Sequence, residues 1–365
     1  MSELFRPLQG NLLLALLVAL LSTQPRCTAE EFATPEEIEQ LLPQHLGAAV
    51  LAVDRGEVVF KHAWGKRHLD QDAPCTQSTN FRLASVSKQF TAASVLKLAD
   101  QGALLLDDTL DTFFTGGPDF WGEVTVHHLL MHTSGVPDYE SIIPEGTELQ
   151  LSDQNILAML IDCEEPAFEP GSRFAYSNSG YVLLGLIVEQ VAHQPFHDFL
   201  ANKVFAPAGM SRSVLYVKGR NRVSERAFGH SLEKGDNWIV ADQSITSAAR
   251  GDGGVYSSLD DLQAWIAALN GGNVLSQRLH KTMFTPHVIT PRNGQSYGYG
   301  WFLDEHHGEP RAMHGGGTRG FCTMLQWFPE RRAGVVILLN RSPGDDTKDY
   351  ADKVVDRLLF NEIAD

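Results

Sequence analysis

The sequence contains little cysteine. Only four cysteines occur in 365 residues, and none forms a C-x-x-C pair, so neither a disulfide framework nor a thiolate metal site is expected. Three of them, Cys75, Cys163 and Cys322, are widely spaced along the chain. A single disulfide in an oxidising compartment and free buried thiols are both open alternatives for these three residues.

Basic residues are scarce relative to acidic ones. The 29 lysines and arginines face 45 aspartates and glutamates, which gives a formal net charge of −16. This balance argues against binding to nucleic acid or to an anionic membrane surface through bulk electrostatics, so we expect no nucleic-acid partner. A hydrophobic content of 43% instead indicates a globular protein with a sizeable core.

Internal repeats and low-complexity tracts are absent, and one apolar run stands out near the N-terminus. Leu12 to Leu21 consists almost entirely of Leu, Ala and Val; it follows Arg6 and precedes the small residues at 27–29. This pattern is typical of a signal peptide over residues 1–29, cleaved after Ala29. We therefore expect a periplasmic or secreted protein with no other membrane contact, the alternative being an uncleaved anchor.

Both ends of the mature chain predict strands. Residues 47–60 are apolar on either side of the turn Asp54-Arg55-Gly56, which is typical of a hairpin. Residues 319–329 and 333–339 predict two more strands, and the apolar residues of 345–363 recur at helical spacing. The terminal segments therefore predict one sheet covered by a helix.

The middle of the chain predicts helices and loops. The helix candidates are Ser85–Gln101, Val124–Met131, Asp153–Ile161, Ser179–Ala192, Pro195–Val204 and Leu259–Leu269. Together with the ends, they predict an α/β fold for residues 30–365. An antiparallel sheet with flanking helices is built from both chain termini, about 44–80 and 295–365, and a mostly helical domain, about 81–294, is inserted between them.

An S-x-x-K pattern begins the first of these helices. Ser85 and Lys88 are three residues apart and so share one face of a helix, where the amine can take the proton of the hydroxyl. The apolar neighbours predict a buried helix, and desolvation lowers the pKa of a buried lysine enough to make it a base. Four common residue types on an ordinary amphipathic helix are the alternative, so the interpretation depends on partners elsewhere in the chain.

Two further segments supply candidate partners. Tyr176 and Asn178 precede an apolar helix, where a phenol could relay protons and an amide could hold a substrate carbonyl; alternatively Asn178 simply caps that helix. The run His314-Gly315-Gly316-Gly317 starts a predicted strand, where glycines permit close approach and leave backbone N–H groups free for an oxyanion. A plain glycine-rich turn is the alternative there.

Taken in order, these segments resemble the serine β-lactamase and penicillin-binding-protein superfamily, in particular the branch of the class C β-lactamases, D-alanyl-D-alanine carboxypeptidases and related esterases. Ser85 and Lys88 match its first motif, Tyr176 and Asn178 its Y-x-N motif, and His314-Gly315-Gly316 the position of its K-T-G or H-x-G motif. Three other segments are also similar to family patterns: 126–137 to the LL-x-H-x-SG segment, 251–262 to a glycine-rich lead into a helix, and 297–301 to a YGxGW strand.

The resemblance implies an acyl-enzyme mechanism without a cofactor or metal. Ser85 would attack a carbonyl, the backbone N–H groups of Ser85 and Gly317 would form the oxyanion hole, and water would release the acyl group. Lys88, with Tyr176 as proton partner, would take the serine proton, and either of the two could be the working base. Asn178, His314, Gly315 and Gly316 would bind the substrate.

The third motif departs from that of the lactamases. His314, a weaker and pH-dependent cation, replaces the lysine that binds the β-lactam carboxylate, and Gly315 has no hydroxyl. We therefore expect a small-molecule or peptide substrate with an amide or ester bond, such as that of a D-alanyl peptidase or esterase. A true class C-like β-lactamase is the first alternative, and a non-catalytic penicillin-binding or sensor protein is the second.

Other clusters of titratable residues favour structural interpretations. His128 and His132 are one helical turn apart but lack the glutamate of an H-E-x-x-H metal motif. His193 and His197 flank Pro195, so they are not expected to share a helix face. The acidic residues Glu164, Glu165 and Glu169 are interpreted as a solvated loop.

Overall fold

In the computed structural model, the described residues are 33–365 without 234–236, 273, 293, 343–346 and 362–365, and they belong to one compact unit. The predicted signal segment, residues 1–29, lies outside the described residues. Within the described part, no helix is long and apolar enough to cross a membrane.

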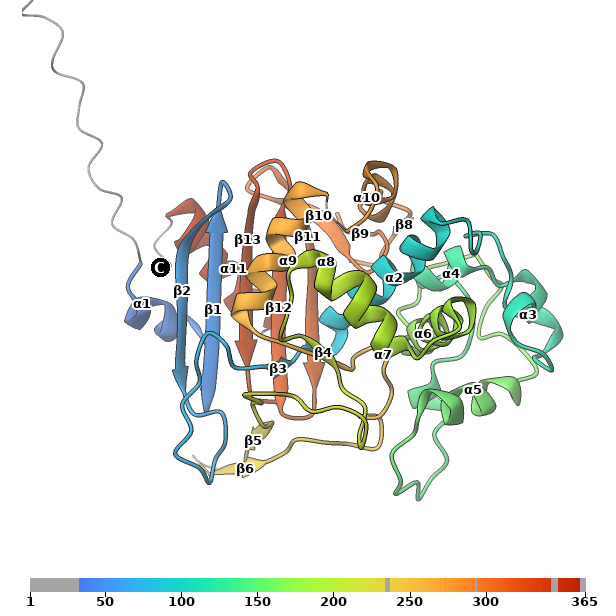
Figure 1. Cartoon of the computed structure of the whole chain (residues 1–365), viewed down its shortest axis with the longest axis horizontal. Coiled ribbons are helices and arrows are strands. Elements are labelled where there is room, and N and C mark those ends of the chain that lie inside the picture. Colours follow the sequence, from blue (N-terminus) through green and yellow to red (C-terminus); the bar gives the residue numbers. More distant parts are fainter. Residues whose placement is uncertain (1–32, 234–236, 273, 293, 343–346, 362–365) are drawn as a thin grey trace, which may run out of the picture. The chain divides into compact units, whose positions relative to one another are not determined.

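Eight strands form one antiparallel sheet in the order β2-β1-β13-β12-β11-β10-β9-β8 (Figure 1). The two ends of the chain meet where β1 pairs with β13, with Val50 opposite Ile337. This pairing confirms the expectation of a sheet built from both termini. The strand bounds are β1 Gly47–Asp54, β2 Glu57–Gly65, β8 Val288–Ile289, β9 Ser296–Tyr297, β10 Phe302–His306, β11 Glu309–Thr318, β12 Phe321–Phe328 and β13 Ala333–Leu339.

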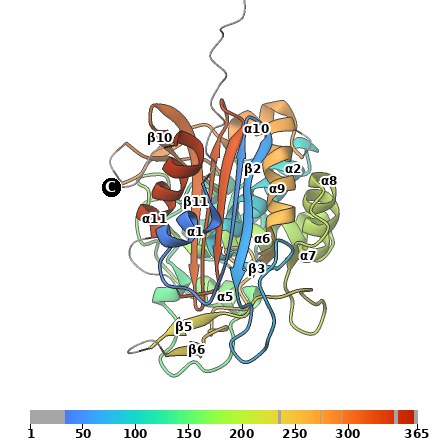
Figure 2. The ribbon, with the colours of Figure 1, turned by 90° about the vertical axis from the view of Figure 1, so that its left-hand side faces the viewer.

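Helices cover both faces of this sheet, which explains why its central strands are continuously apolar. In β1, Ala48 and Val50 belong to a core cluster with α1 (Pro35–Leu41), α11 (Thr347–Val355) and the π-helix η5 (Asp356–Phe360), whereas Ala49 and Leu51 belong to the main core on the other face. Figure 2 shows α1 and α11 on one side of the strands and α9 (Leu259–Gly271) on the other.

The helical region lies between β2 and β8 in sequence, as predicted. It is centred on α2, in which ten of the thirteen residues are buried and which packs against α6. Its elements are η1 Ala84–Ser87, α2 Lys88–Asp100, α3 Leu110–Phe113, η2 Asp119–Glu123, α4 Val126–Leu130, η3 Tyr139–Ser141, α5 Asp153–Ile161, α6 Asn178–Ala192, α7 Phe196–Phe199, η4 Leu200–Phe205, α8 Ala206–Ala208, α9 Leu259–Gly271 and α10 Gln277–Met283.

Short strands complete the helical region. β3 (Phe81–Arg82), β7 (Val255–Ser257) and β4 (Val214–Leu215) form one small sheet, and β5 (His230–Leu232) pairs with β6 (Trp238–Val240). Cys75 and Cys163 carry free thiols, and Cys322 Sγ lies 3.0 Å from the Tyr350 hydroxyl. Burial raises the pKa of the Cys75 thiol to about 12. This favours the free-thiol alternative over a single disulfide.

Several predicted elements differ from the observed ones. Residues 297–301 are not one strand: Tyr297 ends β9, Gly300 has a φ of 80°, and β10 begins at Phe302. The chain turns there because it passes close to the start of α2, where a Cβ on Gly300 would lie 2.9 Å from Gln89 Cα. Prediction also missed α10, and the expected helix 195–204 is α7 followed by a π-helix.

Strand β11 lies tightly against η1, and this contact brings the first and third motifs together. A methyl group at Gly316 would overlap the Leu83 carbonyl oxygen, which belongs to the rigid backbone. A methyl group at Gly315 would meet only the flexible end of Met324, at 3.2 Å from its Cε. The close approach therefore requires glycine at 316 but not at 315.

We predict that Gly316→Ala lowers the free energy of unfolding by about 1–3 kcal/mol, because the strand must move away from η1. Gly315→Ala is the matched control and should cost less than about 1 kcal/mol. Urea denaturation of both variants beside the wild type measures the difference. Equal losses in the two variants would contradict this account of the β11–η1 contact.

Candidate active site

Ser85 lies on the 3-10 turn η1, immediately before α2. The preceding residue, Ala84, is buried and has a φ of 48°, which places a non-glycine residue in the left-handed region. Backbone strain of this kind costs on the order of 1–3 kcal/mol and persists where the surroundings fix it, often at functional sites. Here it turns the chain so that Ser85 lines two hollows on the surface.

Lys88 begins α2, and its ammonium is fully buried. Its Nζ donates to Ser85 Oγ at 3.1 Å, to Asn178 Oδ1 at 2.8 Å and to the Asp252 carbonyl oxygen at 3.0 Å. An ammonium has three donors, so three acceptors satisfy it completely. If Nζ is neutral, the same geometry lets its lone pair face the Ser85 hydroxyl while two hydrogen bonds continue to hold the amine.

Asn178 is positioned by a cap that another segment provides. It is the first residue of α6, and its backbone N–H donates to Asp138 Oδ2 at 2.6 Å, while Ser177 at the N-cap position provides no side-chain bond. The interpretation of Asn178 as a simple helix cap is therefore wrong. Its side chain instead bridges Lys88 and Glu140, with Nδ2 donating to Glu140 Oε1 at 3.2 Å.

Tyr176 lies between Lys88 and the solvent. Its ring centroid is 5.0 Å from Lys88 Nζ, and its ring contacts His132 at 4.3 Å and stacks on Phe302 at 6.2 Å. The residue is 38% exposed and lines the larger hollow beside Ser85. The phenol thus stands at the opening of the site, next to the buried amine.

The segment 314–317 is the part of β11 that borders the hollows. The ladder between β10 and β11 ends at Met313, whereas pairing with β12 continues to Thr318. The edge of β11 beyond Met313 therefore faces η1 instead of another strand, and Ser85 and Gly317 line the same two hollows. This is the arrangement that a backbone oxyanion hole requires.

The charge state of His314 differs from the one expected from the sequence. It is buried; its Nδ1 lies 2.7 Å from the Gly315 carbonyl oxygen, and its Nε2 lies 3.2 Å from the Tyr297 hydroxyl. Burial, together with the nearby Lys88, lowers the pKa of His314 to about 3. The expectation that His314 is a weak, pH-dependent cation was therefore wrong, because burial keeps the imidazole neutral in the physiological range.

His132, interpreted from the sequence as structural, also contacts the site. Its Nδ1 accepts the Ser177 backbone N–H at 3.1 Å, its φ is 59°, and burial holds its pKa well below the usual value. The neutral His132 ring therefore packs against the Tyr176 ring, with 4.3 Å between the ring centroids. His128 is used elsewhere, since its Nδ1 accepts the Thr125 N–H of the α4 capping box, which agrees with a structural role for both histidines.

Acidic residues that no motif indicated gather beside Asn178. Glu140 and Asp252 line the smaller hollow, of about 50 Å³, and Tyr139 donates its hydroxyl to Asp252 Oδ2 at 3.1 Å. Burial raises the pKa of Glu140 and of Asp252, and the nearby Lys88 opposes both shifts. The only signal in the sequence was their position relative to two family-like segments: Glu140 lies three residues after the segment 126–137, and Asp252 lies within the segment 251–262.

Basic side chains line the larger hollow, on the Tyr176 side of Ser85, in contrast to the acidic lining of the smaller hollow. Its volume is about 800 Å³, and three cations, Arg173, Arg292 and Lys348, lie among its lining residues. Arg173 stacks over Phe168 at 4.1 Å and Arg292 over Phe302 at 5.8 Å, whereas Lys348 is paired with Asp352. Arg319, which follows the glycine run of β11 closely, is exposed and is not among the lining residues.

A family model described as Beta-lactamase matches residues 36–359, and the chain therefore belongs to the Beta-lactamase family. It is 29% identical over 332 residues to a penicillin-binding protein of Bacillus subtilis (strain 168), a match that covers 87% of this chain and 73% of the relative. It is also 29% identical over 304 residues to a D-aminopeptidase of Brucella anthropi, covering 82% of this chain and 56% of the relative, so the chain spans little more than half of that protein.

A solved structure gives the same result. The octameric penicillin-binding protein homologue from Pyrococcus abyssi superposes with a TM-score of 0.78 and 28% identity, over 89% of this chain and 75% of that one. The similarity confirms the predicted β-lactamase/transpeptidase-like fold. Family and fold together identify the protein as an enzyme of the serine hydrolase class.

The buried histidine predicts an acid-sensitive fold. Because the pKa of His314 falls from 6.5 to about 3 on folding, the unfolded chain binds more protons between these values. The stability that the neutral ring provides is complete above the unfolded pKa and is lost as the pH falls through this window. His132 contributes with the same sign, whereas the raised pKa values of Glu140 and Asp252 contribute with the opposite sign.

We predict that His314→Asn flattens the dependence of the unfolding free energy on pH in this window. One proton accounts for a slope of at most about 1.4 kcal/mol per pH unit, so the variant should lose up to that amount of slope. Denaturant titrations of wild type and variant at a series of pH values measure it. An unchanged slope would show that His314 is not buried in its neutral form.

Proposed function

We propose that this protein hydrolyses small amides through an acyl-enzyme on Ser85. The observation that carries the proposal is the contact of 3.1 Å between the Lys88 amine and Ser85 Oγ, made by a buried amine that Asn178 and the Asp252 carbonyl hold through two further hydrogen bonds. A nucleophile and a base in hydrogen-bond contact, with the base oriented by further groups, are the apparatus of nucleophilic catalysis.

In the proposed reaction, Ser85 Oγ attacks the carbonyl carbon as its proton passes to the Lys88–Tyr176 pair. The backbone N–H groups of Ser85 and Gly317 hold the oxyanion. The proton then moves through Tyr176 to the leaving nitrogen, because Tyr176 lies between the amine and the larger hollow. Water entering from that side then attacks the acyl carbon and gives a proton to the same pair. The pair passes this proton to Ser85 Oγ as the acid leaves, which restores the free hydroxyl.

The charges around Ser85 support a substrate that carries opposite charges at its two ends. If the leaving group departs past Tyr176, it occupies the hollow lined by Arg173 and Arg292. The acyl part then directs only its amino end into the smaller hollow beside Asn178 and Glu140, because about 50 Å³ holds no larger group. This favours an acyl group that carries an ammonium and a leaving group that carries an acid, as in a short peptide with a free amino end. The D-aminopeptidase among the relatives is consistent with such a substrate.

β-Lactam turnover is less favoured by the site. His314 is neutral and Gly315 has no hydroxyl, so the carboxylate contacts that the K-T-G motif provides are absent at these two positions. Purely non-catalytic binding is also less favoured, because Ser85, Lys88 and Tyr176 are all present and close together. Esters, whose leaving group needs less protonation, remain within the proposed chemistry.

We also propose that the protein is exported to the periplasm or the medium by the leader at residues 1–29. The support is the sequence alone: Arg6, the apolar run from Leu12 to Leu21 and the small residues that end at Ala29. N-terminal sequencing of the protein recovered from outside the cytoplasm tests this. A chain that stays in the cytoplasm with Met1 intact would contradict it.

Ser85→Ala should abolish multiple turnover of a D-alanyl peptide and of a nitrophenyl ester, because the nucleophile is removed. Intact mass spectrometry with a fluorophosphonate should detect one adduct on the wild type and none on the variant. Ser87→Ala is the matched control: Ser87 Oγ accepts the Val255 N–H at 3.1 Å, so this variant should lose about 1 kcal/mol of stability but keep the adduct. Hydrolysis or labelling that survives in Ser85→Ala would refute the mechanism.

Glu140→Gln should lower kcat/KM roughly tenfold for amino-acyl amides with a free amine and change it less than twofold for a neutral ester of similar size. The reason is that the Glu140 carboxylate attracts the ammonium of an amino-acyl substrate, whereas a neutral ester has no charge for it to attract. Glu145→Gln, an exposed change in the following loop, is the control and should alter neither substrate. Equal losses for both substrates would assign Glu140 to the positioning of Asn178 instead.

A further inference from the structure

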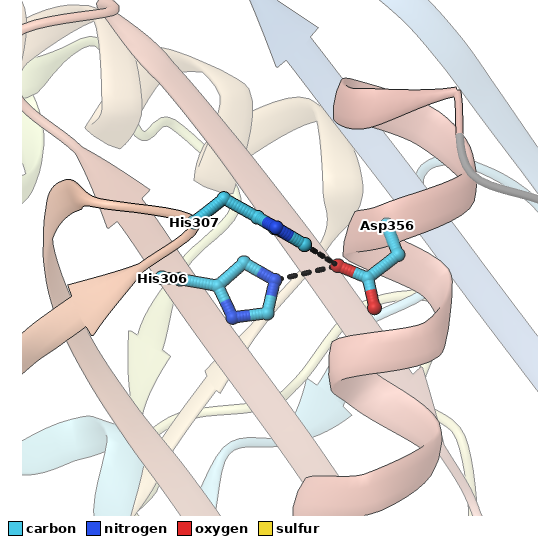
Figure 3. A group of neighbouring side chains, drawn as sticks. All are labelled: His306, His307 and Asp356. Carbon is cyan, nitrogen blue, oxygen red and sulfur yellow. Dashed lines mark hydrogen bonds and ion pairs between the residues drawn. The ribbon is translucent and has the colours of Figure 1, made fainter.

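A second cluster of titratable side chains lies outside the proposed active site, on the turn between β10 and β11. Figure 3 shows His306 and His307 facing the carboxylate of Asp356, which comes from the C-terminal helix η5. Their Nε2 atoms lie 2.6 Å and 2.9 Å from the same oxygen, Asp356 Oδ1. The three possible ligand atoms are all within 4.8 Å of one another.

Only the turn makes this convergence possible. Neighbouring residues of a strand point to opposite faces, so two successive histidines would normally diverge. β10 ends at His306, His307 has a φ of 49°, and Gly308 has a φ of 75°, so the chain reverses in a two-residue hairpin and both rings turn to one side. Asparagine and glycine are the usual residues at that first left-handed position. Histidine is a less common choice, and here it delivers a second imidazole.

An aromatic wall shields the cluster without closing it. The Phe360 ring lies 5.6 Å from the His306 ring and 4.6 Å from the His307 ring. Arg331, the cation that also contacts Phe360, is paired with Asp54 at 2.6 Å and so does not compete directly for Asp356. The side chains of His306, His307 and Asp356 are 14%, 35% and 26% exposed, which leaves room for an ion to enter and for water to complete its coordination.

We propose that His306, His307 and Asp356 bind a divalent late transition metal, with Zn²⁺ as the expected ion. Two imidazoles and one carboxylate are a ligand set that suits such metals, with water in the remaining position. At metal–ligand distances of about 2.0–2.2 Å, tetrahedral ligands are about 3.3 Å apart. The present spacings of 2.6 Å and 2.9 Å are those of hydrogen bonds, so the ion replaces the Nε2 protons and side-chain shifts of roughly half an ångström accommodate it.

The site is separate from the proposed chemistry at Ser85. β10 runs from Phe302, in the wall of the larger hollow, to His306, and four strand steps span roughly 13 Å. A bound ion would join the β10–β11 hairpin to the C-terminal helix η5. In the sequence the hairpin precedes β12 and β13, and the helix follows them. Its consequence is therefore stability: binding to the folded chain alone raises the melting temperature with metal concentration.

The test is titration of the purified full chain, freed of metal by a chelator, with Zn²⁺ in a calorimeter, followed by melting curves with and without Zn²⁺. We expect one ion per chain and a Tm that rises with Zn²⁺. His307→Asn removes one ligand and places the preferred residue in the turn, so it should fold, yet weaken Zn²⁺ binding at least about tenfold. Asp356→Asn should weaken binding to a similar degree.

His197→Asn is the matched control, because His197 also faces an aspartate, Asp198 at 3.5 Å, but has no second histidine in that pair. It should leave the affinity and the Zn²⁺-dependent rise in Tm unchanged. Absence of saturable binding, or an affinity that is the same in wild type, His307→Asn and Asp356→Asn, would overturn the proposal. If the Tm of the wild type does not rise with Zn²⁺ and His307→Asn lowers the Tm equally with and without Zn²⁺, the cluster is a hydrogen-bonded link and no more.

Discussion

The burial of the Lys88 amine constrains every other part of the site. A charged or strongly polar nitrogen removed from water costs several kcal/mol unless all of its donors are satisfied. The three acceptors come from η1, from the start of α6 and from the segment before β7, so three distant stretches of chain must meet at one atom. The left-handed Ala84 and the cap that Asp138 provides to α6 are both consequences of this meeting.

The same requirement explains the glycines of β11. The strand must lie against η1 for its free edge to face Ser85, and only a residue without a side chain fits at Gly316 beside the Leu83 carbonyl. Thr323 on the neighbouring strand donates its hydroxyl to that same carbonyl at 2.8 Å, so the contact is held by a hydrogen bond as well as by packing. The sheet, built from both chain ends, is therefore the rigid support for a site whose other residues come from the helical region.

The sequence predicted what depends on local pattern and missed what depends on distant contacts. The hairpin turn at Arg55 and Gly56, the bounds of α5 and of β13, and the neighbourhood of Ser85 and Lys88 follow from spacing, propensity and motif. The charge state of His314 does not, because it is set by burial under Tyr297 and by the nearby Lys88, both remote in sequence. Likewise Asn178 matched the pattern of a helix cap, and only the position of Asp138 releases its side chain for Lys88.

The distribution of charge around Ser85 follows from these constraints and bears on the substrate. Because His314 is held neutral, the cavity wall closest to Lys88 carries no second cation from β11, and the positive groups lie further out, on the loops of Arg173 and Arg292. On the opposite side, Glu140 cannot move away without losing its bond to Asn178, which in turn holds Lys88. The acidic group is thus fixed near the nucleophile whereas the basic groups are on adaptable side chains. Under the proposed mechanism we expect selection to be stricter for the acyl group than for the leaving group, because the exposed carboxylate of Glu140 is held by Asn178 whereas the two arginines can rearrange.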